Sequence, residues 1–452
     1  MSQALSLTTD PIPKLTWQIA LPMSIGMFFN TMFNVVDTFC AGWLGTEALA
    51  ALSLSFPVFF TVFAVGSGIA QGTTALLSIS LGGGNNKDAR HVFAQALLFV
   101  IVAGVVLSFL GWLAAPWLYR QLGAEGDYLR TSLAYMNVIL AGGVFVLLPM
   151  VVNAGLSAQG NTLPYRNFLI AGFVVNLLLN PLFILGWFGL PKMGVGGIAL
   201  ATVIVQIGGG LYLWSHVAKS DVYRGIRFHD LKPDREILIR IAGQAVPAAL
   251  NMLTIAVGVF VITWFVKNFG QEAVAAIGIA TRVEQIVLMP SIGLNAAVLS
   301  IVGQNYGAGH YDRVREAWLT NVKYGALMML VGGLLVFFTR KLSMRIFTDD
   351  PTVIAHGSDY LISASLTLVA YPILFVTVFA LQGLKRPAFG LWMGLYRQLA
   401  APIIVFHLLT FTLGWGLWGV WWGVCMVTWS AAIFALFWGW KKICSCGTQQ
   451  DD

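Results

Sequence analysis

Long apolar stretches follow one another along the chain, and they limit its possible folds more than any other feature. Each is near or above 20 residues, the length of α-helix that crosses the hydrocarbon core of a bilayer. The stretches lack the strict alternation of membrane β-strands. Only 10% of the residues are charged, against about 25% in an average soluble domain. We therefore expect an all-α integral membrane protein.

Twelve such stretches can be counted, and an even number puts both termini on one side of the membrane. They cover residues 15–41, 50–80, 90–118, 128–149, 165–187, 195–218, 237–266, 274–304, 314–338, 357–382, 388–412 and 416–440. Lys and Arg are concentrated in the loops on the side of the termini, which predicts that this side is cytoplasmic. The loop with Arg340, Lys341 and Arg345 is the exception, and a short interfacial helix would explain it. The net charge of +7 therefore reports topology and does not indicate a nucleic-acid partner.

The polar connection at residues 219–239 divides the spans six and six, into an N-lobe (1–218) and a C-lobe (240–440) followed by a tail (441–452). A shift of 225 residues aligns the halves without a gap over about 70 positions. Pro22 falls on Pro247, LGTEALAAL (44–52) on FGQEAVAAI, and LGGGNNKDAR (81–90) on YGAGHYDRVR. Two parallel six-helix repeats predict lobes related by a pseudo-twofold axis along the membrane normal, with a substrate path between them.

Asp37 is the one acidic side chain in the first apolar stretch. Asn30, Asn34 and Asp37 are spaced four and then three residues apart, which predicts one helix face. A carboxylate costs about 2.5–3.5 kcal/mol at the bilayer centre and less near an interface. The alternative is that the helix surfaces earlier and Asp37 is simply hydrated. We predict that Asp37 is desolvated and is protonated reversibly, as a proton-coupling residue requires.

The repeat motifs resemble those of the multidrug and toxic compound extrusion (MATE) family. The resemblance rests on VDTFCAGWLGTEALAALSLSFPV, SLGGGNNKDARHV and RVEQIVLMPSIGLNAAVLSIVGQNYGAG, and it covers essentially the whole chain. It implies a two-lobed, twelve-helix secondary antiporter that exports cationic and amphipathic compounds against inward H⁺ or Na⁺. The acidic residue in the first helix resembles the DinF-like branch, whose coupling site is an N-lobe carboxylate.

The resemblance also implies a polar cluster in the N-lobe. Asn176 and Asn180 are spaced four apart, Thr202 lies in the next stretch, and these residues match the family cluster that faces Asp37; Asn34 joins it by its spacing. Asn180 stands where many relatives carry Asp. One carboxylate fewer weakens a Na⁺ site, because hard cations prefer charged oxygen ligands, and this favours H⁺. The alternative role for the amides is interhelical hydrogen bonding, worth about 0.6 kcal/mol per bond.

Other candidates lie at a proline and in the C-lobe. Pro22 can kink the first helix, although its repeat partner Pro247 favours a purely architectural role equally. Glu284 is the backup coupling residue. Arg282 is two residues away and does not share its helix face, whereas Arg397 is a candidate partner from another span. A structural ion-pair network is the alternative to a second cation site.

Together these features predict a proton-coupled multidrug efflux antiporter of the cytoplasmic (inner) membrane that works by alternating access. The expected partners are small-molecule drugs, organic cations and membrane lipid, and the expected state is a monomer. A Na⁺-coupled antiporter and a lipid-linked-precursor flippase are the alternatives; a flippase would need more intramembrane cations than Arg282 and Arg397. No clustered catalytic motif, pore loop, nucleotide loop or metal-type cysteine spacing occurs in the sequence. We therefore expect no enzyme activity, no channel, and no metal or cofactor beyond the coupling ion.

Overall fold

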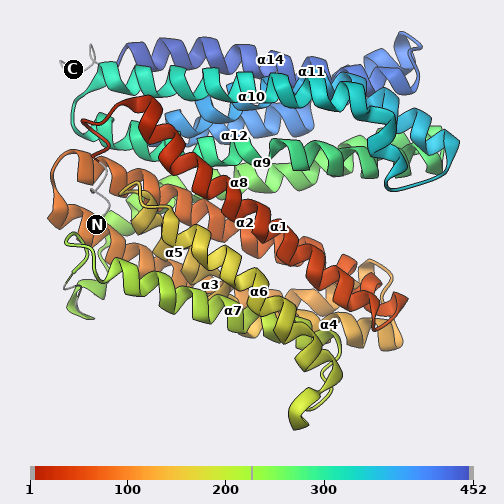
Figure 1. The fold of residues 1–452 in the computed structure, drawn as a ribbon, viewed down its shortest axis with the longest axis horizontal. Helices are drawn as coiled ribbons and strands as arrows, with labels where there is room; N and C mark the ends of the chain where they lie inside the picture. Colours follow the sequence, from red (N-terminus) through yellow and green to blue (C-terminus); the bar gives the residue numbers. More distant parts are fainter. Residues whose placement is uncertain (1–5, 225, 227, 447–452) are drawn as a thin grey trace. The chain divides into compact units, whose positions relative to one another are not determined.

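The computed structural model describes residues 6–224, 226 and 228–446, and in these residues every regular element is a helix (Figure 1). The membrane-length helices of the first half are α1 (Ile12–Gly42), α2 (Thr46–Gly82), α3 (Asn86–Gln121), α6 (Leu163–Leu185) and α7 (Val195–Val217). Those of the second half are α8 (Arg235–Val266), α9 (Gln271–Gly307), α10 (Tyr311–Arg345), α11 (Pro351–Gly383) and α14 (Leu417–Cys444).

Shorter elements complete the set. They are α4 (Gly126–Ala141), α5 (Gly143–Ser157), α12 (Ala388–Leu395), α13 (Ala401–His407), the 3-10 turns η1 (Trp187–Gly189), η2 (Phe228–Leu231) and η3 (Lys267–Phe269), and the π turns η4 (Tyr396–Ala400) and η5 (Leu408–Thr412). The run from α12 to η5 has the length and hydropathy of a single span. Eleven helices in the described residues qualify as membrane spans, and α4 with α5 supplies a twelfth when the bent pair counts as one. The prediction of an all-α membrane protein is confirmed.

The fourth span differs from its predicted extent. It continues to Ser157 instead of ending at residue 149, and α4 and α5 meet at an angle of 48°. The break falls at Gly142, whose φ and ψ of −88° and 5° leave the helical range. A Cβ atom there would lie 2.5 Å from Val203 Cγ2 on α7. The absence of a side chain therefore permits the close approach of α7 at the bend.

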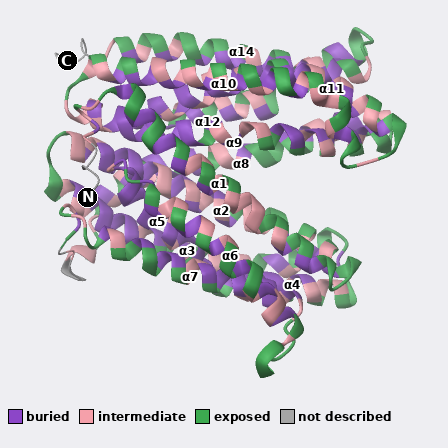
Figure 2. Ribbon diagram, in the orientation of Figure 1, coloured by how far each residue is buried: buried purple, intermediate pink, exposed green. Residues whose placement is uncertain are grey.

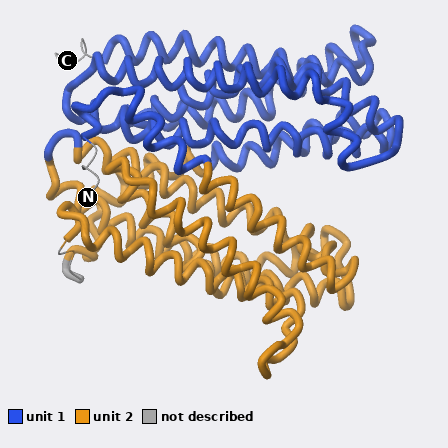
Figure 3. The backbone as a smooth tube through the Cα atoms, viewed as in Figure 1, with its two compact units in different colours: residues 1–24, 82–84, 250–452 blue, residues 25–81, 85–249 orange. Residues whose placement is uncertain are grey.

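The chain forms two compact units, which Figure 3 colours separately. Unit 1 contains residues up to Ser24, residues 82–84, and the chain from Leu250 onward; unit 2 contains residues 25–81 and 85–249. These boundaries differ from the predicted lobes, because the start of α1 packs with unit 1 and the start of α8 packs with unit 2. The two symmetric lobes stay a prediction.

Each unit has its own apolar core. In unit 2 the core joins Phe93 and Tyr119 of α3 to Met136 of α4 and Ile198 of α7. In unit 1 one cluster packs Ile12, Leu15 and Ile19 of α1 against α9 and α10, where the fully buried Trp318 lies. A second cluster joins α8, α9, α11 and α14 and includes Trp421. The start of α1 is thus part of the core of unit 1.

The outward faces of the helices are apolar as well. Phe338 is 78% exposed, Phe260 70% and Leu211 68%, and Figure 2 shows exposed positions recurring along the helices. Such side chains would be solvated by lipid tails in a membrane, where the apolar surface carries no penalty. The pattern agrees with membrane-spanning helices.

Candidate ion-coupling site

Two helices of unit 2, α6 and α7, bring neutral hydrogen-bond donors to the carboxylate of Asp37 on α1. Asp37 lies near the end of α1, and its Oδ1 accepts hydrogen bonds from Asn176 Nδ2 (3.0 Å) and Asn180 Nδ2 (2.8 Å). The two asparagines are one turn apart on α6, and both are fully buried. Thr202 Oγ1 on α7 lies 3.3 Å from Oδ2. The structure therefore brings together Asp37, Asn176, Asn180 and Thr202.

The electrostatics of this site are unbalanced while Asp37 is charged. Asp37 is only 6% exposed, and none of its three partners carries a charge. Within the described residues, no Lys, Arg or His forms an ion pair with it. A buried charge without a counter-charge is costly, because hydrogen bonds replace only part of its hydration. One proton or one bound cation would neutralise it.

Two atoms of the site have spare hydrogen-bonding capacity. Asn180 Nδ2 also donates to Asn176 Oδ1 (3.1 Å), whereas Asn180 Oδ1 is buried and has no hydrogen-bond partner among the residues that the structure describes. Thr202 Oγ1 lies 3.1 Å from the carbonyl oxygen of Ile198 as well as close to Asp37. The Thr202 hydroxyl can therefore donate either to the carboxylate or to its own helix.

Asn34 does not join this group. Its side chain is exposed, and its Nδ2 donates to the carbonyl oxygen of Asn30 (2.8 Å). A helical step of three residues turns about 300°, which leaves Asn34 beside the face of Asp37 instead of on it. The predicted place of Asn34 in the polar cluster is therefore wrong.

Tyr135 and Cys40 are neighbours that the sequence reasoning missed. Tyr135 on α4 is 8% exposed, Cys40 is one turn from Asp37 on α1, and both interact electrostatically with Asp37. A tyrosine within an apolar span was the available signal, since its hydroxyl group needs a polar neighbour when it is buried.

Pro22 is buried within α1, and the helix continues through it without a break. Proline has no N–H group, so one backbone hydrogen bond of α1 is missing at this point. Two residues later Ser24 Oγ donates to the carbonyl oxygen of Pro290 (3.0 Å), and the boundary between the units follows Ser24. The weakened turn of α1 thus lies close to the place where the helix passes from unit 1 to unit 2.

Glu284 has a separate environment in unit 1. It is 5% exposed, and its Oε2 accepts a hydrogen bond from the Tyr360 hydroxyl of α11 (2.8 Å), while Oε1 has no hydrogen-bond partner in the described part of the chain. Arg397 interacts electrostatically with Glu284 and lies over the ring of Tyr371 at 5.4 Å, but the two charges form no ion pair among those of the described residues. Arg282 is exposed and is not brought to this group.

Neither carboxylate belongs to a metal-type cluster. In the described part of the chain, no three His, Cys, Asp or Glu side chains come together in a way that could hold a metal ion. The fold and this site define a polytopic membrane transporter with one isolated buried carboxylate in unit 2.

The chain belongs to the MatE family, whose model matches residues 22–182 and 247–406. The two matched segments correspond to the two halves of the repeat. The resemblance seen in the sequence motifs is therefore confirmed, and the chain is a multi-pass membrane protein of a transporter family.

Relatives and solved structures agree with this assignment. The chain is 27% identical over 425 residues to "Probable multidrug resistance protein YoeA" of Bacillus subtilis, covering 86% of this chain and 91% of the relative. It is 30% identical over 397 residues to the "FAD transporter" of Shewanella oneidensis, covering 86% of each. A MATE family multidrug resistance transporter solved in an outward-facing conformation matches with a TM-score of 0.92 and 26% identity, covering 99% of this chain and all of that one.

Proposed function

We propose that this protein exports small organic compounds from the cell in exchange for H⁺, and that reversible protonation of Asp37 is the coupling event. The observation that carries the proposal is the burial of Asp37 among Asn176, Asn180 and Thr202, with no cationic side chain of the described residues paired to it. Alternating access between two lobes, cytoplasmic termini, a monomeric state and a place in the cytoplasmic membrane belong to the same proposal.

The donor set favours H⁺ over Na⁺. Both asparagines direct NH₂ groups at Asp37 Oδ1, whereas a hard cation needs several oxygen ligands around it. A proton on Oδ2 can instead be donated to Thr202 Oγ1, whose own hydrogen then turns to the carbonyl oxygen of Ile198, 3.1 Å away. Both protonation states of Asp37 are thereby hydrogen-bonded without any heavy atom having to move.

Small amphipathic compounds are the substrates that the multidrug relatives suggest, and they are the first candidate. A flavin nucleotide is the second candidate, because the relative described as an FAD transporter is 30% identical to this chain. The two classes differ in charge, so a cationic dye and a flavin nucleotide distinguish them as test substrates. A lipid-linked substrate remains the third alternative.

The decisive measurement is substrate export in proteoliposomes driven separately by a pH gradient and by a Na⁺ gradient. We expect the pH gradient alone to drive export by the wild type, and Asp37→Asn to lose the driven component while it still inserts and folds. Thr38→Val is the matched control, because Thr38 is exposed on the same turn and its hydroxyl bonds only the carbonyl oxygen of Asn34. Export driven only by Na⁺, or normal coupling in Asp37→Asn, would overturn the proposal.

A further inference from the structure

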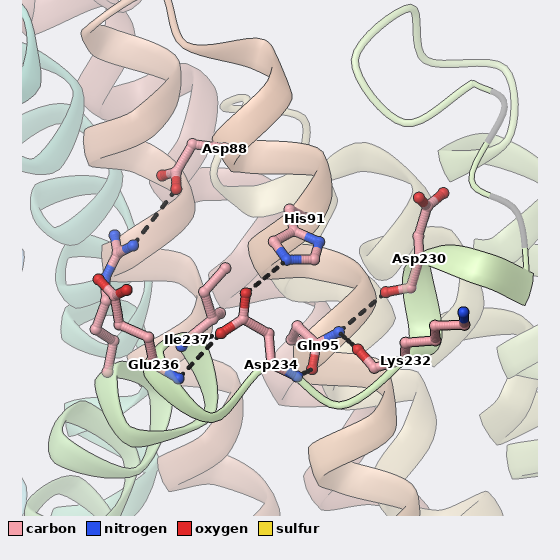
Figure 4. A network of polar contacts seen from close by, with 9 residues as sticks. Asp88, His91, Gln95, Asp230, Lys232, Asp234, Glu236 and Ile237 are labelled. Carbon is pink, nitrogen blue, oxygen red and sulfur yellow. Dashed lines mark hydrogen bonds and ion pairs between the residues drawn. The ribbon is translucent and has the colours of Figure 1, made fainter.

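Each half of the chain holds the segment that leads into the first helix of the other half. In unit 2, side chains of α3 hold residues 230–240, which are the end of the connection and the first turns of α8 (Figure 4). In unit 1, Asn305 and Arg313 hold residues 7–10, which lead into α1. Under the 225-residue repeat, positions 80 and 88 of the first half correspond to 305 and 313, so the two clamps occupy equivalent corners.

The α8 clamp is built around Gln95 and Asp234. The fully buried Gln95 donates from Nε2 to the carbonyl oxygens of Asp230 (3.0 Å) and Lys232 (2.7 Å), and its Oε1 accepts from the N–H of Asp234 (3.0 Å). Asp234 Oδ1 accepts from the N–H groups of Glu236 (3.0 Å) and Ile237 (3.3 Å) and so caps α8. Its other oxygen, Oδ2, lies 3.1 Å from Nε2 of His91 on α3.

The α1 clamp has a different chemistry. Arg313 donates to Asn305 Oδ1 (2.9 Å) and to the carbonyl oxygen of Asp10 (2.6 Å), and Asn305 Nδ2 donates to the carbonyl oxygen of Leu7 (2.9 Å). Its members are an arginine, an amide and backbone groups, and none of these changes charge near neutral pH. The clamp on α8 instead contains His91, and histidine is the type of side chain whose charge ordinarily changes near neutral pH.

We propose that the contact between His91 and Asp234 is a pH-responsive latch, on the side predicted to be cytoplasmic, that slows transport when that side becomes acidic. The proposal rests on proton-coupled export as the function. His91 is 39% exposed and Asp234 38%, so protons from that side reach the pair directly.

Several charged groups come from the elements packed around His91, and Asp234 is the one that pairs with it. Lys87, Asp88 and Arg90 lie on α3, and Asp230, Lys232, Arg235, Glu236 and Arg240 come from the connection and from α8. Asp88 is bonded by Arg240 Nη1 (3.4 Å) and by the Ser80 hydroxyl. Arg90 Nε donates to the carbonyl oxygen of Val222 (3.1 Å). Within the described residues, Asp234 is the carboxylate that pairs with His91.

The direction of the pH effect follows from the charges of Asp234 and His91. The hydrogen bond from His91, with a smaller contribution from the N–H of Ile237, holds the pKa of Asp234 below its usual range. Asp234 therefore stays charged from neutral pH to well below pH 5, and its contribution is lost only as pH falls through its own lowered pKa. Protonation of His91 adds a positive charge to the donor, so the hydrogen bond to the charged Asp234 becomes an ion pair. The latch thus tightens as this side acidifies.

A tighter latch restrains the connection between the two halves. Residues 230–240 are the end of that connection and the first turns of α8, and alternating access requires the halves to change their arrangement. A proton antiporter brings H⁺ to the cytoplasmic side, so the latch limits further acidification by the transporter itself. For a half-exposed ion pair we expect an effect of about two- to fivefold on the rate.

The first test measures export at pH 6 and pH 8 on the latch side, with the pH on the other side fixed. At each pH, the export rate of His91→Gln is divided by that of the wild type. Both proteins experience the same driving force, so this ratio of rates isolates the effect of the latch. We expect export by His91→Gln to be two- to fivefold faster than export by the wild type at pH 6 and equally fast at pH 8. Asp234→Asn should show the same pattern. Glu316→Gln is the matched control, since Glu316 is exposed at the equivalent position of α10. A ratio independent of pH, or the same shift in the control, would overturn the latch.

The second test does not depend on transport. Hydrogen exchange of the full-length protein gives protection factors for the amides of residues 234–237, corrected for the intrinsic effect of pH. We expect greater protection at pH 6 than at pH 8 in the wild type and no such difference in His91→Gln. If this difference appears but no pH gradient drives export, the latch stands and the proposed function fails. If export is proton-driven and protection does not change with pH, the latch is wrong.

Discussion

At the scale of single residues, Thr202 gives the site two ways of satisfying the same carboxylate. Its Oγ1 lies within hydrogen-bonding distance of both Asp37 Oδ2 and the carbonyl oxygen of Ile198. It is a donor to the charged carboxylate and an acceptor from the protonated one. A serine can do the same, whereas valine has the same shape and neither capacity.

We therefore expect Thr202→Val to slow proton-driven export about tenfold or more, because an unsatisfied buried polar group costs about 1–3 kcal/mol. Thr202→Ser should retain most of the rate. Initial rates under a fixed pH gradient, with the amount of protein in the membrane measured in parallel, give the comparison. Equal loss in both variants would assign Thr202 a packing role instead.

Asn180→Asp tests the choice of coupling ion. The new carboxylate would lie against Asp37, where Asn180 Nδ2 is now 2.8 Å from Oδ1. Two adjoining carboxylates cannot both ionise easily, and a Na⁺ ion would compensate them better than it compensates one. We expect Na⁺ to raise the melting temperature of the variant and not that of the wild type, with choline chloride as the ionic-strength control. Equal stabilisation of both proteins by Na⁺ would argue against the proton as coupling ion.

Part of this site could be predicted from the sequence. Asp37 stood out because a lone acidic residue in an apolar span requires compensation, and the one-turn spacing of Asn176 and Asn180 fixed a shared face. The prediction failed for Asn34, because a three-residue step only approximates one helix face and the side chain found its own backbone at Asn30. Contacts between distant segments, such as that of His91 with Asp234, leave no periodic signal.

At the scale of elements, the bend between α4 and α5 depends on a missing side chain. The extent of the other spans could be predicted from their apolar length, but this bend could not, because the stretch remains apolar on both sides of Gly142. A side chain at Gly142 would collide with Val203 on α7, and this proximity exists only in the packed structure.

Gly142→Ala should therefore destabilise the protein by about 1–3 kcal/mol, because overpacking forces neighbours apart. Val203→Ala in the same chain should restore much of the loss. Gly208→Ala on α7 is the matched control, since an added Cβ meets nothing within 4 Å there, and it should be neutral or slightly stabilising. Thermal unfolding in detergent gives the comparison; no rescue by the second substitution would contradict the steric explanation.

At the scale of the whole molecule, the halves of the sequence are not the compact units of the structure. The long connection predicts a six-and-six division, whereas nothing in the sequence predicts the exchange of helix starts, because apolar residues pack equally well against either half. Ile12, Leu15 and Ile19 of the first half complete a core whose other members include Leu294 and Trp318 of the second.

Halves divided after Arg224 should consequently be unstable when each is produced alone and should accumulate when produced together. The reason is that the second half alone would expose the surface that Ile12, Leu15 and Ile19 cover. The amount of each fragment retained in the membrane measures the effect. Equal accumulation of the fragments alone and together would show that each half closes its own core.

The exchanged helix starts also constrain how a chain of this kind can arise. A half-length protein with one copy of the repeat could not complete its core alone, but two copies could complete each other by domain swapping. Joining the copies into one chain would make that pairing intramolecular and raise the effective concentration of the partner to the millimolar range. Once joined, the copies can diverge. Such a history would explain why the first copy carries Asp37 where the aligned position of the second copy carries Ile262.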